Sequence, residues 1–392
     1  MTFVLINEIR TVEFAGVTCT VSDWRVASWS AVGRAVSRIR CQCVLQPKCA
    51  DSLNRLTATN RGHCFAFGRC GQLTAGVILL LMSVVSGAST AGANPGKWSI
   101  PVEIEGQLAP GGSLNLSEVA CSSSNFCVAV DSLGAALFWH GSRWSAPHHV
   151  NANGSLDSVS CPSTTHCVVV SDAGMAVTYD NGAWSTPKTI GPGDSYRVSC
   201  PSDNFCAAVG ANGLPGKPST IATFNGHSWS SHLTTTSGNQ NDRLLGVSCA
   251  AATYCVAINY DGQILTFNGR RWSPMPKVGP KGLISVSCPG RLFCLAVTIS
   301  GVSIEIHATS WTSSTIIPKF QAALSYSVSC ATSITCVVAG LNGQTDKWRA
   351  GMWSTPVKVF TGGSNALVST SCTPSGFCMV ITSRGKSSFE NH

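Results

Sequence analysis

Cysteines six positions apart recur seven times between residues 121 and 378 of this 392-residue chain. The pairs are Cys121 and Cys127, Cys161 and Cys167, Cys200 and Cys206, Cys249 and Cys255, Cys288 and Cys294, Cys330 and Cys336, and Cys372 and Cys378. Self-similarity at a period of about forty residues is typical of propellers and solenoids, and it restricts the chain to repeat architectures.

A tryptophan recurs with each cysteine pair, usually within a W-S-x-P string. The seven positions are Trp98, Trp144, Trp184, Trp229, Trp272, Trp311 and Trp353. From the second cysteine of a pair to the next tryptophan the spacing is 17 residues, except in the third unit, where it is 23. The third unit therefore carries an insertion of six residues.

Each unit reads as four short strands, as in Ser158–Cys161 followed by Cys167–Val170, a third strand ending near an aromatic residue, and a fourth beginning at the tryptophan. Asn-Gly or Gly separates the third and fourth strands, which is the chemistry of a tight hairpin. Four antiparallel strands per unit predict an all-β, seven-bladed β-propeller with the small first strand innermost. A leucine-rich or helical repeat would need a 3.6-residue apolar period, which the units lack.

The two ends of the repeat region complement each other. When Cys378 is aligned with Cys127, the chain stops just before a fourth strand, whereas Trp98 begins a fourth strand that has no blade. We predict that residues 94–392 form one propeller whose seventh blade is closed by N- and C-terminal strands, which removes exposed sheet edges.

Residues 61–93 have the order of a signal peptide. Basic residues between Arg61 and Arg69 precede an apolar run, Leu73–Val85, and small residues ending at Ala91-Gly92-Ala93. The alternative is a membrane anchor, but about fifteen apolar residues are short for a span. We expect cleavage, no stable membrane span afterwards, and an extracellular or cell-envelope location.

Residues 1–60 fit neither a signal peptide nor a domain. We interpret them as the result of a start codon assigned too far upstream, or as a disordered extension. A start near Val44 or Leu56 would restore an ordinary signal peptide. The alternative is a real cytoplasmic extension, in which Cys41, Cys43 and Cys49 could be taken for a metal site, but no second pair or histidine stands at zinc spacing. We expect no metal and no cofactor.

The fourteen repeat cysteines are expected to form one disulfide per blade across the first hairpin. The other six cysteines, Cys19, Cys41, Cys43, Cys49, Cys64 and Cys70, all precede the proposed cleavage site. The exported chain would then carry no odd thiol, as an oxidising compartment favours.

Composition and net charge limit the classes of partner that we expect for this protein. Hydrophobic residues make up 44% of the chain and charged residues 11%, which excludes a disordered protein. The formal charge is +8, of which residues 94–392 contribute only +3. That charge is too small to indicate nucleic acid or an anionic membrane, and we expect a monomer.

The strings Val159-Ser160-Cys161-Pro162-Ser163 and Trp184-Ser185-Thr186-Pro187 resemble exported Cys/Trp-repeat propeller proteins of high-G+C Gram-positive bacteria, and distantly BNR or sialidase-like propellers. The resemblance covers residues 94–392 and implies the fold alone. A sialidase would show Asp-boxes and an arginine triad, and Ser171-Asp172-Ala173-Gly174 has the wrong spacing for an Asp-box.

The common catalytic signatures are missing, and the catalytic residues are unknown. Two functions stay open. One is a secreted binding module for a glycan or protein ligand. The other is a glycosidase or lyase whose acid and base come from different blades, for which a pair of inward carboxylates would be the mark.

A ligand-binding site is expected on the face that carries the loops between strands two and three and between consecutive blades, which we call the upper face. There the insertion of the third unit and the next connection lengthen adjacent loops, although neutral drift in surface loops is the alternative. The candidate ligand-binding residues are Asp194, Arg197, Lys217, Asn241, Asp242 and Arg243.

Overall fold

The computed structural model describes residues 10–14, 17–21, 42–44 and 97–391, with gaps at 105–114, 193, 211–217, 234–242, 277–278, 309, 317–325, 341–342 and 361–366. The chain divides into two compact units, Met1–Ala88 and Ser89–His392. In the first unit, β1 (Arg10–Phe14) pairs with β2 (Val17–Val21), and β2 pairs with β3 (Gln42–Val44). The predicted signal peptide lies outside the described residues.

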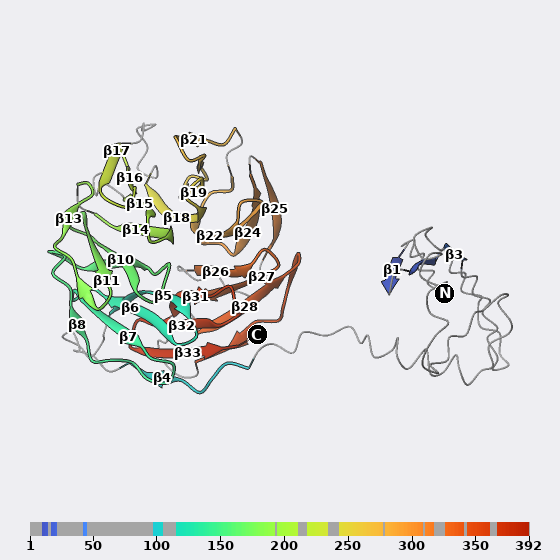
Figure 1. The fold of residues 1–392 in the computed structure, drawn as a ribbon, viewed down its shortest axis with the longest axis horizontal. Helices are drawn as coiled ribbons and strands as arrows, with labels where there is room; N and C mark the ends of the chain where they lie inside the picture. Colours follow the sequence, from blue (N-terminus) through green and yellow to red (C-terminus); the bar gives the residue numbers. More distant parts are fainter. Residues whose placement is uncertain are drawn as a thin grey trace, which may run out of the picture. The chain divides into compact units, whose positions relative to one another are not determined.

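The second unit is the predicted seven-bladed propeller, and its described residues form only strands and connections (Figure 1). Each blade is an antiparallel sheet that begins with its innermost strand. Blade 1 consists of β5 (Leu116–Ser123), β6 (Phe126–Asp131), β7 (Ala135–Trp139) and β8 (His148–His149), and blade 2 of β9 (Leu156–Ser160), β10 (His166–Ser171), β11 (Met175–Asp180), β12 (Ala183–Trp184) and β13 (Lys188–Thr189). Blade 3 consists of β14 (Tyr196–Ser202), β15 (Phe205–Gly210), β16 (Thr220–Phe224) and β17 (Trp229–Leu233). Blade 4 consists of β18 (Leu244–Ala251), β19 (Tyr254–Asn259), β20 (Ile264–Phe267) and β21 (Trp272–Pro274).

The remaining blades follow the same order. Blade 5 consists of β22 (Leu283–Gly290), β23 (Phe293–Thr298), β24 (Val302–His307) and β25 (Ser310–Ile316). Blade 6 consists of β26 (Tyr326–Thr332), β27 (Thr335–Gly340), β28 (Gln344–Arg349), β29 (Met352–Trp353) and β30 (Val357–Lys358). Blade 7 consists of β31 (Leu367–Cys372), β32 (Cys378–Thr382), β33 (Lys386–Glu390) and β4 (Val102–Glu103).

The first strands of all blades are innermost, as predicted. Each contacts the first strand of the next blade, so that β5, β9, β14, β18, β22, β26 and β31 form a closed ring around the centre (Figure 1). Their small residues suit this position because strands crowd near the axis of a propeller.

The ring closes through both ends of the repeat region, which confirms the predicted composite blade. In blade 7, β33 pairs with β4 in the register Lys386↔Glu103 and Ser387↔Val102. Just before β4, the Ser99 N–H donates to the Phe389 carbonyl at 2.7 Å, and the Phe389 N–H donates to the Ser99 hydroxyl at 3.1 Å. The closure therefore continues the sheet hydrogen bonding past the two paired residues.

All seven predicted disulfides are present, each within its own blade. In blade order they join Cys121 to Cys127, Cys161 to Cys167, Cys200 to Cys206, Cys249 to Cys255, Cys288 to Cys294, Cys330 to Cys336, and Cys372 to Cys378. No bridge connects different blades among these fourteen cysteines, so the assignment of one C-x5-C pair to each blade is confirmed.

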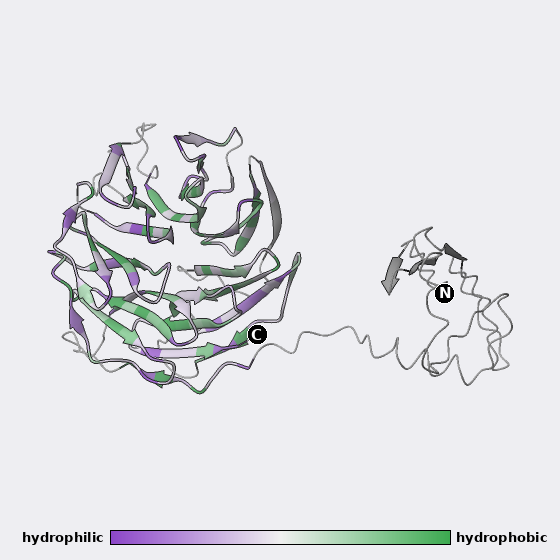
Figure 2. Cartoon of the chain, viewed as in Figure 1, coloured by the Kyte–Doolittle hydropathy of each residue, from purple (hydrophilic) through white to green (hydrophobic). Residues whose placement is uncertain are grey.

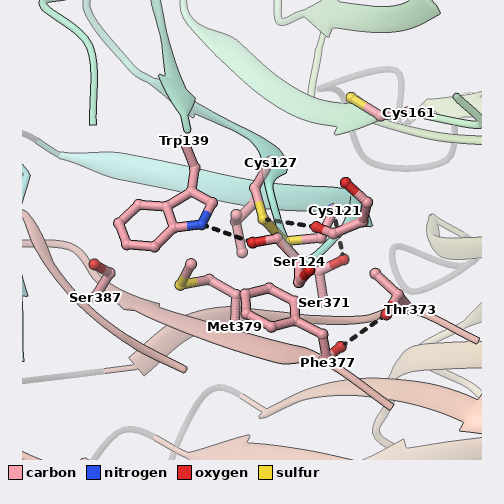
Figure 3. Close-up of a disulfide and its surroundings, with 12 residues drawn as sticks. Cys121, Ser124, Cys127, Trp139, Cys161, Ser371, Thr373, Phe377, Met379 and Ser387 are labelled. Carbon is pink, nitrogen blue, oxygen red and sulfur yellow. Dashed lines mark hydrogen bonds between the residues drawn. A yellow bond between two sulfur atoms is a disulfide. The ribbon is translucent and has the colours of Figure 1, made fainter. Parts of the chain in front are cut away.

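Figure 3 shows the surroundings of the blade 1 disulfide. Beside it, the Trp139 indole N–H donates to the Ser124 carbonyl at 3.0 Å, and the Cys121 N–H donates to the Ser371 hydroxyl of blade 7 at 2.9 Å. The disulfide is thus fixed within its hairpin and against the neighbouring blade.

The hydrophobic core lies between neighbouring blades, and hydrophobic residues follow the middle strands in Figure 2. In several blades the aromatic at the end of the third strand packs against the tryptophan of the fourth. Trp139 and Trp144 of blade 1 have ring centroids 5.6 Å apart, and Trp139 lies 5.5 Å from Phe389 of blade 7. Aromatic side chains therefore fill the widening space between blades, where their large area contributes most.

A buried ion pair joins blades 6 and 7. The Lys347 ammonium in β28 lies 2.7 Å from Oε2 of Glu390 in β33, and the two side chains are 3% and 0% exposed. Burial lowers the pKa of Lys347, and the hydrogen bond to Glu390 opposes that shift. The pair links the last strand of the chain to its neighbouring blade.

The adjacent residue Asp346 makes the stability of the propeller pH-dependent. Its buried Oδ1 accepts hydrogen bonds from the Lys347 N–H and the Ser354 hydroxyl, and burial raises the pKa of this carboxyl to about 6. Because the folded pKa lies above the usual value of 3.8, the stabilisation is complete below about pH 4 and is lost as the pH rises to about 6.

We expect Asp346→Asn to raise the free energy of unfolding by about 2–3 kcal/mol at about pH 7.5, because an amide never ionises. The advantage should shrink towards zero near pH 4, where the carboxyl of the unaltered protein is protonated in both states. Urea unfolding of both proteins at the two pH values measures it, and an equal gain at both pH values would contradict the pKa shift.

Candidate functional site

The innermost strands enclose a cavity of about 320 Å³ whose lining residues come from all seven blades. Seven of them occupy the same register position, three residues before the first cysteine of each pair. In blade order they are Glu118, Ser158, Arg197, Gly246, Ser285, Ser327 and Ser369. Four of the seven residues are serine. Blades 1, 3 and 4 therefore depart from the repeat at this channel-facing position, with Glu118, Arg197 and Gly246.

Serines directly before the first cysteine connect the blades around the channel. In six of seven blades this serine hydroxyl accepts a hydrogen bond of 2.8–2.9 Å from the N–H of the next blade's first cysteine. Blade 1 has Ala120 there. An innermost strand has no neighbour on its inner edge, so these hydroxyls satisfy N–H groups that would otherwise have no protein partner.

The serine hydrogen bonds just described form one ring around the channel. The side chains three residues before the first cysteine of each pair form a second ring of hydrogen bonds between blades. A side chain in this position accepts a hydrogen bond from the N–H two residues before the next blade's cysteine. Four serines do so at 3.1–3.2 Å, namely Ser158 to Val198, Ser285 to Val328, Ser327 to Thr370 and Ser369 to Val119. Glu118 replaces serine in blade 1, and its Oε2 accepts from the Val159 N–H at 3.3 Å.

This second ring is broken at two neighbouring positions. Arg197 has no acceptor and Gly246 has no side chain, so neither can accept a hydrogen bond from Val247 of blade 4 or Val286 of blade 5. The Cys249 and Cys288 N–H groups point to the inner edge, and strand alternation points those of Val247 and Val286 the same way. Two backbone donors therefore face the cavity without a partner from this ring.

The charged residues of the channel lie on blades 1 to 3. Burial raises the pKa of the Glu118 carboxyl, while Arg197 lowers it. Arg197 is exposed in the channel, and its Nη1 donates to the carbonyls of Tyr196 at 3.0 Å and Asp157 at 3.3 Å. Asp157 accepts from the Tyr196 N–H at 2.9 Å, and burial raises its pKa too.

Half-buried apolar residues also line the cavity. Leu245, Ile284 and Val368 are half-buried and precede the ring position in blades 4, 5 and 7. In blades 4, 5 and 7 the register between the first and second strands shifts at Leu245, Ile284 and Val368. Each shift places one extra residue of the innermost strand beside the channel. Blade 3 has no such shift there: the Tyr196 ring is fully buried and occupies the space that a Cβ at Gly210 would need.

The predicted ligand-binding residues are partly brought together. Arg197 lines the channel, and Arg243 Nη2 lies 3.5 Å from Asp194 Oδ2 at the upper face of blade 3. Lys217, Asn241 and Asp242 lie outside the described residues. The role of these six residues stays a prediction.

Sequence reasoning missed Glu118 and the unpaired donors. Aligning the seven units on their first cysteine would have exposed the departures at Glu118, Arg197 and Gly246. The donors of Val247 and Val286 have no side-chain signature of their own, because every residue except proline carries an N–H.

Other candidate chemistry is explained locally or does not occur in the described residues. Asp131 accepts hydrogen bonds from the N–H groups of Leu133 and Ala135, which is a local role in a turn. No group of three metal-ligating side chains occurs in the described part of the chain. Within that same part, no helix has the length and apolar character needed to span a bilayer.

No family model and no curated protein sequence matches the chain. Solved propellers match it in structure. They include YCF48 bound to D1 peptide (TM-score 0.57, 11% identity, 75% of this chain and 95% of that chain) and the WD40 β-propeller domain of Doa1 (0.56, 11%, 75% and 97%). Streptogramin B lyase matches with a TM-score of 0.59 and 9% identity, over 75% of this chain and 98% of that chain. At these identities the likeness shows the β-propeller fold alone.

Proposed function

We propose that this protein is an exported binding module that holds a protein or glycan ligand in the upper mouth of its central channel. The observation that carries the proposal is the cavity, which brings Glu118 and Arg197 together with the half-buried side chains of Leu245 and Ile284. Pockets that combine apolar side chains with a few convergent polar groups are where rigid scaffolds bind ligands.

Two further observations support the proposal. Seven disulfides are typical of a protein in an oxidising compartment, as expected of an exported chain. One structural neighbour is described as bound to a peptide, so a propeller of this fold can bind a peptide.

Filling the mouth of the channel tests the proposal. Ser117 lines the cavity at the register shift of β5, and we expect Ser117→Trp to weaken binding at least about tenfold because the indole occupies ligand space. The purified full-length protein would be screened on glycan and peptide arrays, and the affinity of each hit measured by calorimetry.

The matched control is Ser124→Trp, an exposed residue in the opposite hairpin of the same blade. It should bind every hit as the unaltered protein does. If Ser117→Trp leaves all affinities unchanged while Ser124→Trp lowers them, the ligand binds at the lower face and the proposal is wrong.

A second candidate function is a glycosidase or lyase with a composite site. Glu118 and Asp157 come from adjacent blades, interact electrostatically, and have pKa values raised by burial, which is how a protein prepares a general acid. Mass spectrometry of array hits after prolonged incubation separates the two functions: a binding module returns them intact, and an enzyme returns cleaved products.

A further inference from the structure

The break in the second hydrogen-bond ring leaves a group of donors on one side of the channel. We call this the donor side, and it consists of Arg197 with the backbone N–H groups of Val247 and Val286. Among the described residues, Nη1 makes the side-chain hydrogen bonds of Arg197, and both acceptors are backbone carbonyls. A guanidinium has five N–H donors in all, and Arg197 is exposed where it lines the cavity, so further donors are available to a ligand.

A group with two acceptor oxygens and a negative charge complements this side. Arginine binds carboxylates through two parallel hydrogen bonds, and backbone N–H groups capture terminal carboxylates in other proteins. Glu118 stands on blade 1, two blades away from Arg197. Its carboxyl disfavours a second carboxylate near blade 1, so the ligand's negative charge is directed to blades 3 to 5.

The adjacent side chains indicate what accompanies the carboxylate. Leu245 and Ile284 directly precede Gly246 and Ser285 on the same strands and line the same cavity. An aliphatic side chain would bury apolar area against them, whereas the hydroxyls of a sugar would lose water there without gaining partners. This favours a peptide over an acidic sugar.

We propose that the donor side binds the C-terminal carboxylate of a peptide whose last side chain is aliphatic and packs on Leu245 and Ile284. The inference rests on the proposed function, since it names the ligand class of the same channel. The peptide backbone would then leave through the upper mouth, beside the Asp194–Arg243 ion pair.

The probe is a pool of pentapeptides with four randomised positions and a C-terminal leucine, prepared once as free acids and once as C-terminal amides. Binding to the full-length protein is measured by calorimetry at low ionic strength. We expect the free acids to bind and the amides to bind at least about tenfold more weakly, because an amide loses the charge and one acceptor oxygen.

Arg197→Ser is the decisive variant because it restores the residue that four other blades carry. The new hydroxyl would accept the Val247 N–H as Ser158 accepts that of Val198. The variant should therefore fold normally while losing about ten- to a hundredfold in affinity for the free acids.

Ser329→Ala is the matched control, because Ser329 does not line the cavity. It removes one hydrogen bond between blades, from the Cys372 N–H, and should lower the melting temperature slightly without changing affinity.

Three results would overturn the inference: free acids that fail to bind at about 1 mM, acids and amides that bind equally, or Arg197→Ser with unchanged affinity. Binding of an oligogalacturonate, but not of the peptides, would show that the carboxylate belongs to a sugar. In each case loss of array binding in Ser117→Trp would still support the proposed function, so the two failures can be told apart.

Discussion

After complete reduction the protein should be unfolded at about 25 °C without denaturant. Each of the seven disulfides closes a short hairpin loop, for which the chain-entropy model gives about 2 kcal/mol. Because the bridges lie in separate blades, their contributions should add to about 10–15 kcal/mol, as much as the whole stability of a typical domain.

The measurement is circular dichroism and urea unfolding of the protein, denatured and reduced, then diluted into buffer with and without reductant. The control is the double variant Cys161→Ala/Cys167→Ala, which should still fold and lose only about 2 kcal/mol. A reduced protein with an unchanged urea midpoint would show that the blades are held by packing alone.

Removing one partner of the buried Lys347–Glu390 pair should cost about 3–5 kcal/mol, because the remaining charge stays buried without its counter-ion. We expect Glu390→Gln and Lys347→Met each to lower the melting temperature by roughly 10 °C. The double variant should be less destabilised than the sum of the two, since it leaves no uncompensated charge.

The matched control is the surface pair Lys386–Glu103, 3.1 Å apart, which joins two strands of blade 7 and is 39% and 67% exposed. Lys386→Ala should change the free energy of unfolding by less than about 1 kcal/mol. Equal effects at the two pairs in calorimetric melting curves would contradict the role assigned to burial.

The fold and its closure could be predicted from the sequence because each blade is specified locally. The C-x5-C spacing matches two residues facing each other across a hairpin, and the registers Cys121↔Cys127, Cys249↔Cys255 and Cys330↔Cys336 show this pairing. The Trp98 strand had to join the last unit because an open sheet edge at both ends is unfavourable. These relations connect residues at fixed spacings, so one unit repeated seven times displays them plainly.

The candidate site could not be predicted in the same way, because it depends on contacts between blades. The spacing of residues within one unit gives no information about such contacts. Serine before the first cysteine recurs visibly, but only the tertiary structure shows that its partner is an N–H in the next blade, about forty residues away. Likewise, Arg197 and Gly246 are ordinary residues in the sequence. They leave the Val247 and Val286 donors facing the cavity only because ring closure brings seven free strand edges around one axis. The repeat pattern alone specifies the blade, its disulfide and the number of copies, because these depend on contacts within one unit; the packing of the blades against one another decides which backbone groups a ligand can reach.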